Sequence, residues 1–170
     1  IGASTFRIAA KGEKLEKAAR KFSKDDRYYY VYNTALLIDT SSTMQIHHKS
    51  KLTPGVENMP SWGFLKPLEN LAINLGGTTG SLGTEKIPVI FTDEAGRKIS
   101  PIICYESVYG EFVGNTIDKG AQAIFVITND GWWSDSPGHR QHFLFSVLRA
   151  IETRRSIARS ANTGISAFID

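Results

Sequence analysis

Residues 99–128, ISPIICYESVYGEFVGNTIDKGAQAIFVIT, show the clearest alternation of strand and helix in the chain. Apolar residues 99–103 predict a strand that delivers Cys104, and residues 109–119 predict a helix that ends at Gly120. The run AIFVIT at 123–128 is a continuous apolar stretch of strand length, which indicates a strand covered on both faces. This order favours a layered α/β domain in which helices pack against a sheet.

The segments on either side extend this pattern. Aromatic and β-branched residues predict strands at 1–8, 28–39 and 46–49, and the last two are expected to form an antiparallel pair. Two further strands are expected at 88–92 and 165–169.

Four segments are less regular. Charged residues 11–27 fit either a short surface helix or a hairpin loop, and residues 129–140 read as a loop. Apolar residues recur at helical spacing from 143 through 160, which predicts one helix there. The glycine-rich residues 76–80 read as plain loop, because they lack the lysine and serine or threonine that end a phosphate-binding P-loop.

The composition restricts the class of protein. A chain of 170 residues with 41% hydrophobic content fits one domain, residues 1–170, and contains no run of eighteen apolar residues that could span a bilayer. The formal charge is only +3 and the basic residues alternate with acidic ones, so nucleic acid is not an expected partner. One cysteine excludes an internal disulfide.

That cysteine, Cys104, is the first candidate for chemistry. It lies where an apolar strand turns through Tyr105, Glu106 and Ser107 toward a helix. Amide groups at a helix start favour a thiolate and can donate to an oxyanion. A buried cysteine at the end of a strand is the alternative, and the local sequence leaves both open.

Other polar and aromatic residues have structural and functional readings. Lys49 ends a predicted strand, where a lysine is usually solvated but could stabilise charge near a thiolate. His47 and His48 point to opposite faces of that strand, so no metal site is expected there. The paired Trp132 and Trp133 either pack or meet an apolar ligand. Near the end of the chain, salt bridges are the simplest role for four charged side chains, Arg149, Glu152, Arg155 and Arg159.

Several motifs occur together in one order and cover nearly the whole chain. They are YNT at 32–34, HHKSKLTPGVENMP at 47–60, ICYES at 103–107, NDGWW at 129–133 and RAIETRRSIARSANTGISAFID at 149–170. In this combination the chain resembles the nitrilase superfamily, and within it the apolipoprotein N-acyltransferase family. The resemblance implies an αββα sandwich of α/β class, truncated at the N-terminus and at the C-terminus.

The resemblance also implies roles for individual residues. Cys104 would be the nucleophile, Lys49 the catalytic lysine, and Glu57 an accessory glutamate that orients both. Tyr105 and Glu106 would contribute to oxyanion or substrate binding, and Trp132 would line the entry for acyl chains.

Two differences from the family accompany these roles. The family's general-base glutamate would precede the strand that opens the chain, so we expect these residues alone not to turn over. Lys51 stands where the family tends to have histidine.

The implied reaction has two steps and needs no cofactor or metal. Cys104 would take an acyl group from a membrane phospholipid as a thioester and pass it to the N-terminal amine of a diacylglyceryl-modified apolipoprotein. The domain would sit on the periplasmic, outer face of the bacterial inner membrane, attached to transmembrane segments that these 170 residues do not include. The alternatives are a soluble carbon-nitrogen hydrolase that uses water as the acceptor, and a noncatalytic fragment that binds lipid or lipoprotein.

Overall fold

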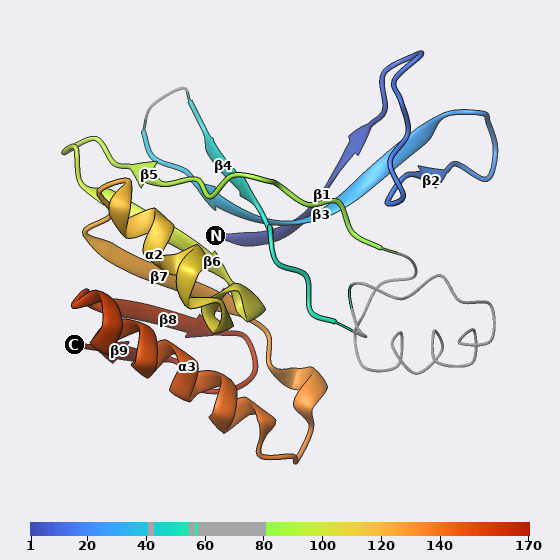
Figure 1. The fold of residues 1–170 in the computed structure, drawn as a ribbon. Helices are drawn as coiled ribbons and strands as arrows, with labels where there is room; N and C mark the ends of the chain where they lie inside the picture. Colours follow the sequence, from blue (N-terminus) through green and yellow to red (C-terminus); the bar gives the residue numbers. More distant parts are fainter. Residues whose placement is uncertain (41–42, 55–56, 58–80) are drawn as a thin grey trace.

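The computed structural model describes residues 1–40, 43–54, 57 and 81–170. In these residues the chain forms a layer of helices, a five-stranded sheet and a four-stranded sheet (Figure 1). The glycine-rich residues 76–80 lie outside the described residues.

The five-stranded sheet contains β6 and β7, the two strands predicted within residues 99–128. Its order is β5-β6-β7-β8-β9, in which β6, β7 and β8 run parallel and the two edge strands are antiparallel to their neighbours. Helix α2 (Gly110–Asp118) connects β6 to β7, and α3 (Gly138–Thr153) connects β7 to β8. Parallel neighbours require such crossovers, and both helices cover one face of the sheet (Figure 1). The strands are β5 (Phe91–Thr92), β6 (Lys98–Ile103), β7 (Ala123–Thr128), β8 (Ile157–Ala161) and β9 (Ala167–Ile169).

The four-stranded sheet is antiparallel and centres on β3 (Tyr28–Leu37). Strand β1 (Gly2–Ile8) pairs with one edge of β3, while β2 (Arg20–Lys21) and β4 (Gln45–His48) pair with opposite ends of its other edge. The predicted antiparallel pair is confirmed, with Thr34 of β3 opposite His48 of β4. Residues 9–27 contain the short strand β2 and turns, so the hairpin loop describes them and the surface helix does not.

Two apolar cores hold the three layers together. One lies between the helices and the five-stranded sheet, and the other lies between the two sheets. Burial of each large aliphatic side chain in these cores stabilises the fold by about 1.5–3 kcal/mol. The first core contains Ile102, Phe112, Val113, Ile124, Val126, Ala150 and Ile157, and the second contains Ala35, Phe91 and Ile103.

This arrangement confirms the α/β class. Neither described α-helix packs on the outer face of the β1–β4 sheet, because α2 and α3 both lie on the other sheet (Figure 1). The fourth layer of an αββα sandwich therefore stays a prediction. No described helix is long and apolar enough to cross a membrane.

The predicted single helix over 143–160 is wrong in its second half. Helix α3 starts earlier, at Gly138, and stops at Thr153, because Arg154 adopts a left-handed conformation with φ of 51°. The following strand β8 pairs in parallel with β7, and it buries Ile157 and Arg159 on one face. The helical spacing of Ile157 and Ala158 was a coincidence that sheet pairing overrides.

Three smaller expectations also need correction. The strand expected over 88–92 shortens to β5, and the loop expected over 129–140 includes the 3₁₀ turn η3 (Gly131–Trp133) and the start of α3. Strand β7 is not covered on both faces, because Phe125 is 45% exposed.

Candidate active site

Cys104 lies at the C-terminal end of β6 and begins the 3₁₀ turn η2 (Cys104–Val108). Its φ of 50° is in the left-handed region, which side chains other than glycine enter at an energetic cost. The residue is half-buried and free of any disulfide. In open α/β sheets, ligands bind at the carboxyl ends of the parallel strands, and Cys104 lies at that edge.

Lys49 directly follows β4 and is fully buried. Its ammonium donates to a Glu57 oxygen at 2.6 Å, and its backbone N–H donates to the Asn33 carbonyl at 2.8 Å. The Glu57 carboxylate also accepts hydrogen bonds from the Asn33 side chain and the Thr53 amide. Because a buried ammonium must keep its partner, this pair fixes the position of Lys49.

Glu106 connects the segment of Lys49 to the strand of Cys104. Its side chain is fully buried, and it accepts from the Ser50 amide at 2.5 Å and the Ile103 amide at 2.8 Å. His47 contacts the same carboxylate at 3.2 Å. Ser50 follows Lys49 and Ile103 precedes Cys104, so one carboxylate holds both candidates in register. This geometry favours a positioning role for Glu106 over a direct substrate contact.

Tyr105 and Trp132 lie at the same edge of the sheet. Tyr105 follows Cys104 in η2, and its ring meets Tyr109 edge-on at 5.8 Å. Trp132 lies in η3 after β7 and stacks on Trp133 at 4.1 Å, with both rings half-buried. Their roles in oxyanion and acyl-chain binding stay predictions.

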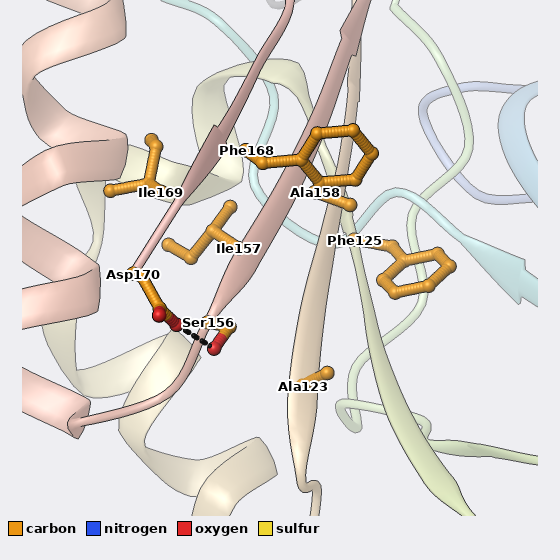
Figure 2. A pocket seen from close by; sticks show the side chains of 8 residues that line it. All are labelled: Ala123, Phe125, Ser156, Ile157, Ala158, Phe168, Ile169 and Asp170. Carbon is orange, nitrogen blue, oxygen red and sulfur yellow. Dashed lines mark hydrogen bonds between the residues drawn. The ribbon is translucent and has the colours of Figure 1, made fainter.

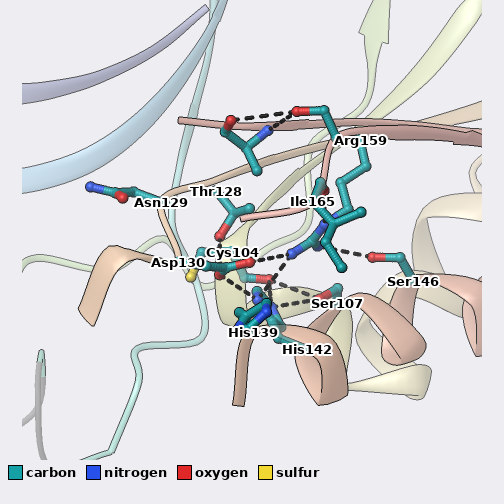
Figure 3. A network of polar contacts seen from close by, with 12 residues as sticks. Cys104, Ser107, Thr128, Asn129, Asp130, His139, His142, Ser146, Arg159 and Ile165 are labelled. Carbon is teal, nitrogen blue, oxygen red and sulfur yellow. Dashed lines mark hydrogen bonds and ion pairs between the residues drawn. The ribbon is translucent and has the colours of Figure 1, made fainter. Parts of the chain in front are cut away.

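A buried polar network contacts the Cys104 backbone, and no pattern in the sequence indicated a role for its members at the nucleophile (Figure 3). Asp130 accepts from Arg159 at 2.7 Å and from the Thr128 hydroxyl at 3.0 Å, and its carboxylate lies 2.7 Å from His142 Nδ1. His142 Nε2 lies 3.1 Å from the Cys104 carbonyl oxygen. These residues come from β7, the following turn, α3 and β8, so sequence spacing could not bring them together.

Ion pairs of the arginine-rich segment form in two places, while Arg155 donates instead to the backbone carbonyls of Ala121 and Arg154. Arg149 and Glu152 pair on α3 at 3.1 Å, as helical spacing suggests. Arg159 instead lies on β8 and reaches Asp130. Burial lowers the pKa of Arg159, and Asp130 partly offsets that effect. Burial alone would raise the pKa of Asp130, but His142 and Arg159 outweigh it and hold that pKa below its ordinary value.

Cys104, Asp130 and His142 place donor atoms within 4.8 Å of one another, the one such group of three or more in the part of the chain that the structure describes. The donor set is a poor fit to a metal. The Arg159 guanidinium already holds Asp130, and both His142 nitrogens face protein oxygens. A cation would have to displace these contacts and share the site with a buried positive charge.

The Cys104 thiol is less acidic than its position at a helix start suggests. Burial raises the pKa of the thiol above its ordinary value of 9.0, and the nearby Lys49 ammonium offsets only part of that effect. At the free thiol, loss of solvent therefore outweighs the positive charge of Lys49.

This pKa gives a pH dependence that can be measured. Alkylation of Cys104 by iodoacetamide is expected to be slow at pH 7 and to keep rising past pH 9, because only the thiolate reacts. Lys49→Met should slow alkylation at every pH below the plateau, since it removes the charge that lowers the pKa. Second-order rate constants between pH 6 and 10, with Lys51→Met as control, would measure both effects. A plateau below pH 8 would contradict this assignment.

An apolar hollow on the five-stranded sheet lies away from this site (Figure 2). Its lining includes Phe125 and Phe168, whose side chain is 94% exposed. Ala123 and Ser156, at the amino ends of β7 and β8, line it as well. Cys104 lies at the opposite, carboxyl edge of the parallel strands. The hollow is therefore separate from the candidate site.

The family model described as carbon-nitrogen hydrolase matches residues 3–170. The chain belongs to the carbon-nitrogen hydrolase family. Among curated relatives, the apolipoprotein N-acyltransferase of Chlorobaculum tepidum is 36% identical over 146 residues, which cover 84% of this chain and 27% of the relative. That of Agrobacterium fabrum is 39% identical over 147 residues, covering 82% and 26%. The chain thus spans about a quarter of the length of these relatives.

Solved structures support the fold of this carbon-nitrogen hydrolase domain. An amidase from Nesterenkonia sp. AN1, with acrylamide added at its active-site cysteine, matches with a TM-score of 0.51 and 19% identity. The match covers 77% of this chain and 42% of the amidase. At this identity the similarity concerns the fold alone.

Proposed function

We propose that this domain transfers an acyl group through a thioester on Cys104. The donor is a membrane phospholipid and the acceptor is the N-terminal amine of a diacylglyceryl-modified apolipoprotein. The observation that carries the proposal is the placement of Cys104 beside the buried Lys49–Glu57 pair, in a chain whose relatives are named apolipoprotein N-acyltransferases. The domain acts at the periplasmic, outer face of the bacterial inner membrane, where both substrates are found.

The first step forms the thioester. The Cys104 thiolate attacks the ester carbonyl, the ester C–O bond breaks, and the lysophospholipid leaves as an alcohol after taking up a proton. Lys49 and the backbone amide of Tyr105 stabilise the negative charge that develops on the carbonyl oxygen. Trp132 provides apolar surface for the acyl chain at the entry.

The second step forms an amide. The acceptor amine attacks the thioester, the C–S bond breaks, and the amine proton moves to a base while the thiol is regenerated. Glu57, Glu106 and Asp130 are each held by several protein donors, so none of them is free to take this proton. The base is therefore a residue other than these three carboxylates. No step uses a cofactor.

A labelled donor tests the proposal directly. The whole native protein, rather than these 170 residues alone, is incubated with vesicles of phospholipid that carries a labelled acyl chain, and peptide mapping then locates the label. We expect acyl label on Cys104 that hydroxylamine removes at neutral pH. A diacylglyceryl-cysteine peptide added afterwards should receive the label on its amine.

Two other outcomes would overturn the proposal. Release of the label as free fatty acid, with no acylation of the peptide, would show that water is the acceptor and that the domain is a hydrolase. Binding of the vesicles without any adduct on Cys104 would identify a noncatalytic lipid-binding domain.

A further inference from the structure

The Cys104 carbonyl oxygen lies among donors that come from outside its own strand. The Ser107 hydroxyl donates to it at 2.9 Å, and His142 Nε2 lies 3.1 Å away (Figure 3). The backbone of Cys104 has a φ of 50°, in the left-handed region that residues other than glycine rarely adopt. A conformation of this kind persists only where the surroundings hold it, and these two side chains contact the Cys104 backbone directly.

His142 is itself held at its other nitrogen. Nδ1 lies 2.7 Å from Asp130 Oδ1, and Asp130 is fixed in turn by Arg159 and Thr128. Arg159 also donates to the Ser146 hydroxyl and to the Ile165 carbonyl. The imidazole therefore bridges two groups. Nδ1 contacts the Asp130 carboxylate, and Nε2 contacts the backbone carbonyl of Cys104.

Both contacts of His142 end on acceptor atoms. A carboxylate and a backbone carbonyl can only accept, so each contact is a hydrogen bond when the ring nitrogen that faces it carries its hydrogen. Two further groups lie near the ring, with Arg159 Nη2 3.2 Å from Nδ1 and the Ser107 hydroxyl 3.2 Å from Nε2. Arg159 also donates to Asp130, Ser146 and Ile165. His142 thus faces the Cys104 carbonyl with Nε2, while its Nδ1 contact with Asp130 fixes the orientation of the ring.

We propose that His142 is a positioning residue that holds Cys104 in its left-handed conformation through the Cys104 carbonyl, with Asp130 and Arg159 as its support. This role deepens the proposed function and rests on Cys104 being the nucleophile. Loss of the carbonyl donor lets the Cys104 backbone relax toward negative φ, which turns the thiol away from the open edge of the sheet. The alternative is an ion-pair network that only joins α3 to β8.

Two substitutions at one position separate these roles. His142→Asn keeps a donor near the place of Nδ1 and loses the contact with the Cys104 carbonyl. His142→Gln keeps a donor near the place of Nε2 and loses the contact with Asp130. Each variant removes the contacts of one ring nitrogen, those of Nε2 with Cys104 and Ser107 or those of Nδ1 with Asp130 and Arg159, so each is the control for the other.

The readout is the second-order rate constant for iodoacetamide at Cys104, located by peptide mapping, in the native protein. We expect His142→Asn to lower it by about tenfold or more and His142→Gln to stay within about threefold of the original, with the same ordering for thioester formation and an unchanged KM for phospholipid. Equal rates in the two variants would overturn the proposal. Because alkylation needs no lipid, it distinguishes failure here from failure of the proposed acyl transfer.

A second variant covers the case in which His142→Asn does not fold. Ser107→Ala removes the other donor to the Cys104 carbonyl and the Ser107 contact with His142 Nε2, and it leaves every Asp130 contact in place. It is expected to slow alkylation in the same direction as His142→Asn. Unchanged alkylation in Ser107→Ala would then overturn the proposal.

Discussion

Replacement of Cys104 by serine is expected to abolish the covalent adduct and to lower acyl transfer by roughly 10⁴-fold or more, the scale on which loss of a covalent nucleophile is felt. An alcohol is far harder to deprotonate than a thiol, and the surroundings of Cys104 already raise the pKa of the group they hold. The oxygen would also be a poorer leaving group in the second step.

The measurement is intact mass spectrometry after incubation with phospholipid vesicles, followed by a peptide acylation assay. The thermal midpoint serves as the control, because a hydroxyl fits the space of the thiol beside Thr128, and we expect the folded state to persist. An acyl adduct on another residue of the Cys104→Ser variant would show that the nucleophile lies elsewhere.

The second large effect is expected at Lys49, with Lys51 as its matched control. Lys49→Met removes a buried ammonium near the thiol and should slow thioester formation by about 10²–10³-fold, as does loss of a donor to an oxyanion. Lys51 is exposed, and its ammonium lies 5.6 Å from the centre of the Tyr109 ring. Lys51→Met should change the free energy of unfolding by less than about 1 kcal/mol and leave the thioester intact.

A stability control separates chemistry from folding at Lys49. Lys49→Met leaves Glu57 with its Asn33 and Thr53 donors but without its cation, which we expect to cost up to about 3 kcal/mol of unfolding free energy. The double variant Lys49→Met/Glu57→Gln removes both charges and should recover part of that loss. Recovery of stability without recovery of the thioester would assign the effect to chemistry. Full activity in Lys49→Met with loss in Lys51→Met would reverse the assignment of the two lysines.

Local sequence was sufficient for most elements. The strand ending at Ile103, helix α2 and strand β7 follow from apolar run length and a terminal glycine, which are properties of neighbouring residues. The motifs around Lys49 and Cys104 also pointed to the family that the comparisons confirm. Residues 157–160 were assigned wrongly, because whether they extend a helix or join a sheet depends on the edge of β7, which lies elsewhere in the chain.

The sequence by itself determined the α/β class and the family, and it predicted which residues carry chemistry. Tertiary structure alone decided how those residues meet. Glu106 connects Ser50 to Ile103 across 53 positions, and Asp130, His142 and Arg159 converge behind Cys104 from three separate elements. Hydrogen bonds and charges act over a few ångströms in space. Residues far apart in sequence therefore interact only after sheet pairing and core packing have set their positions.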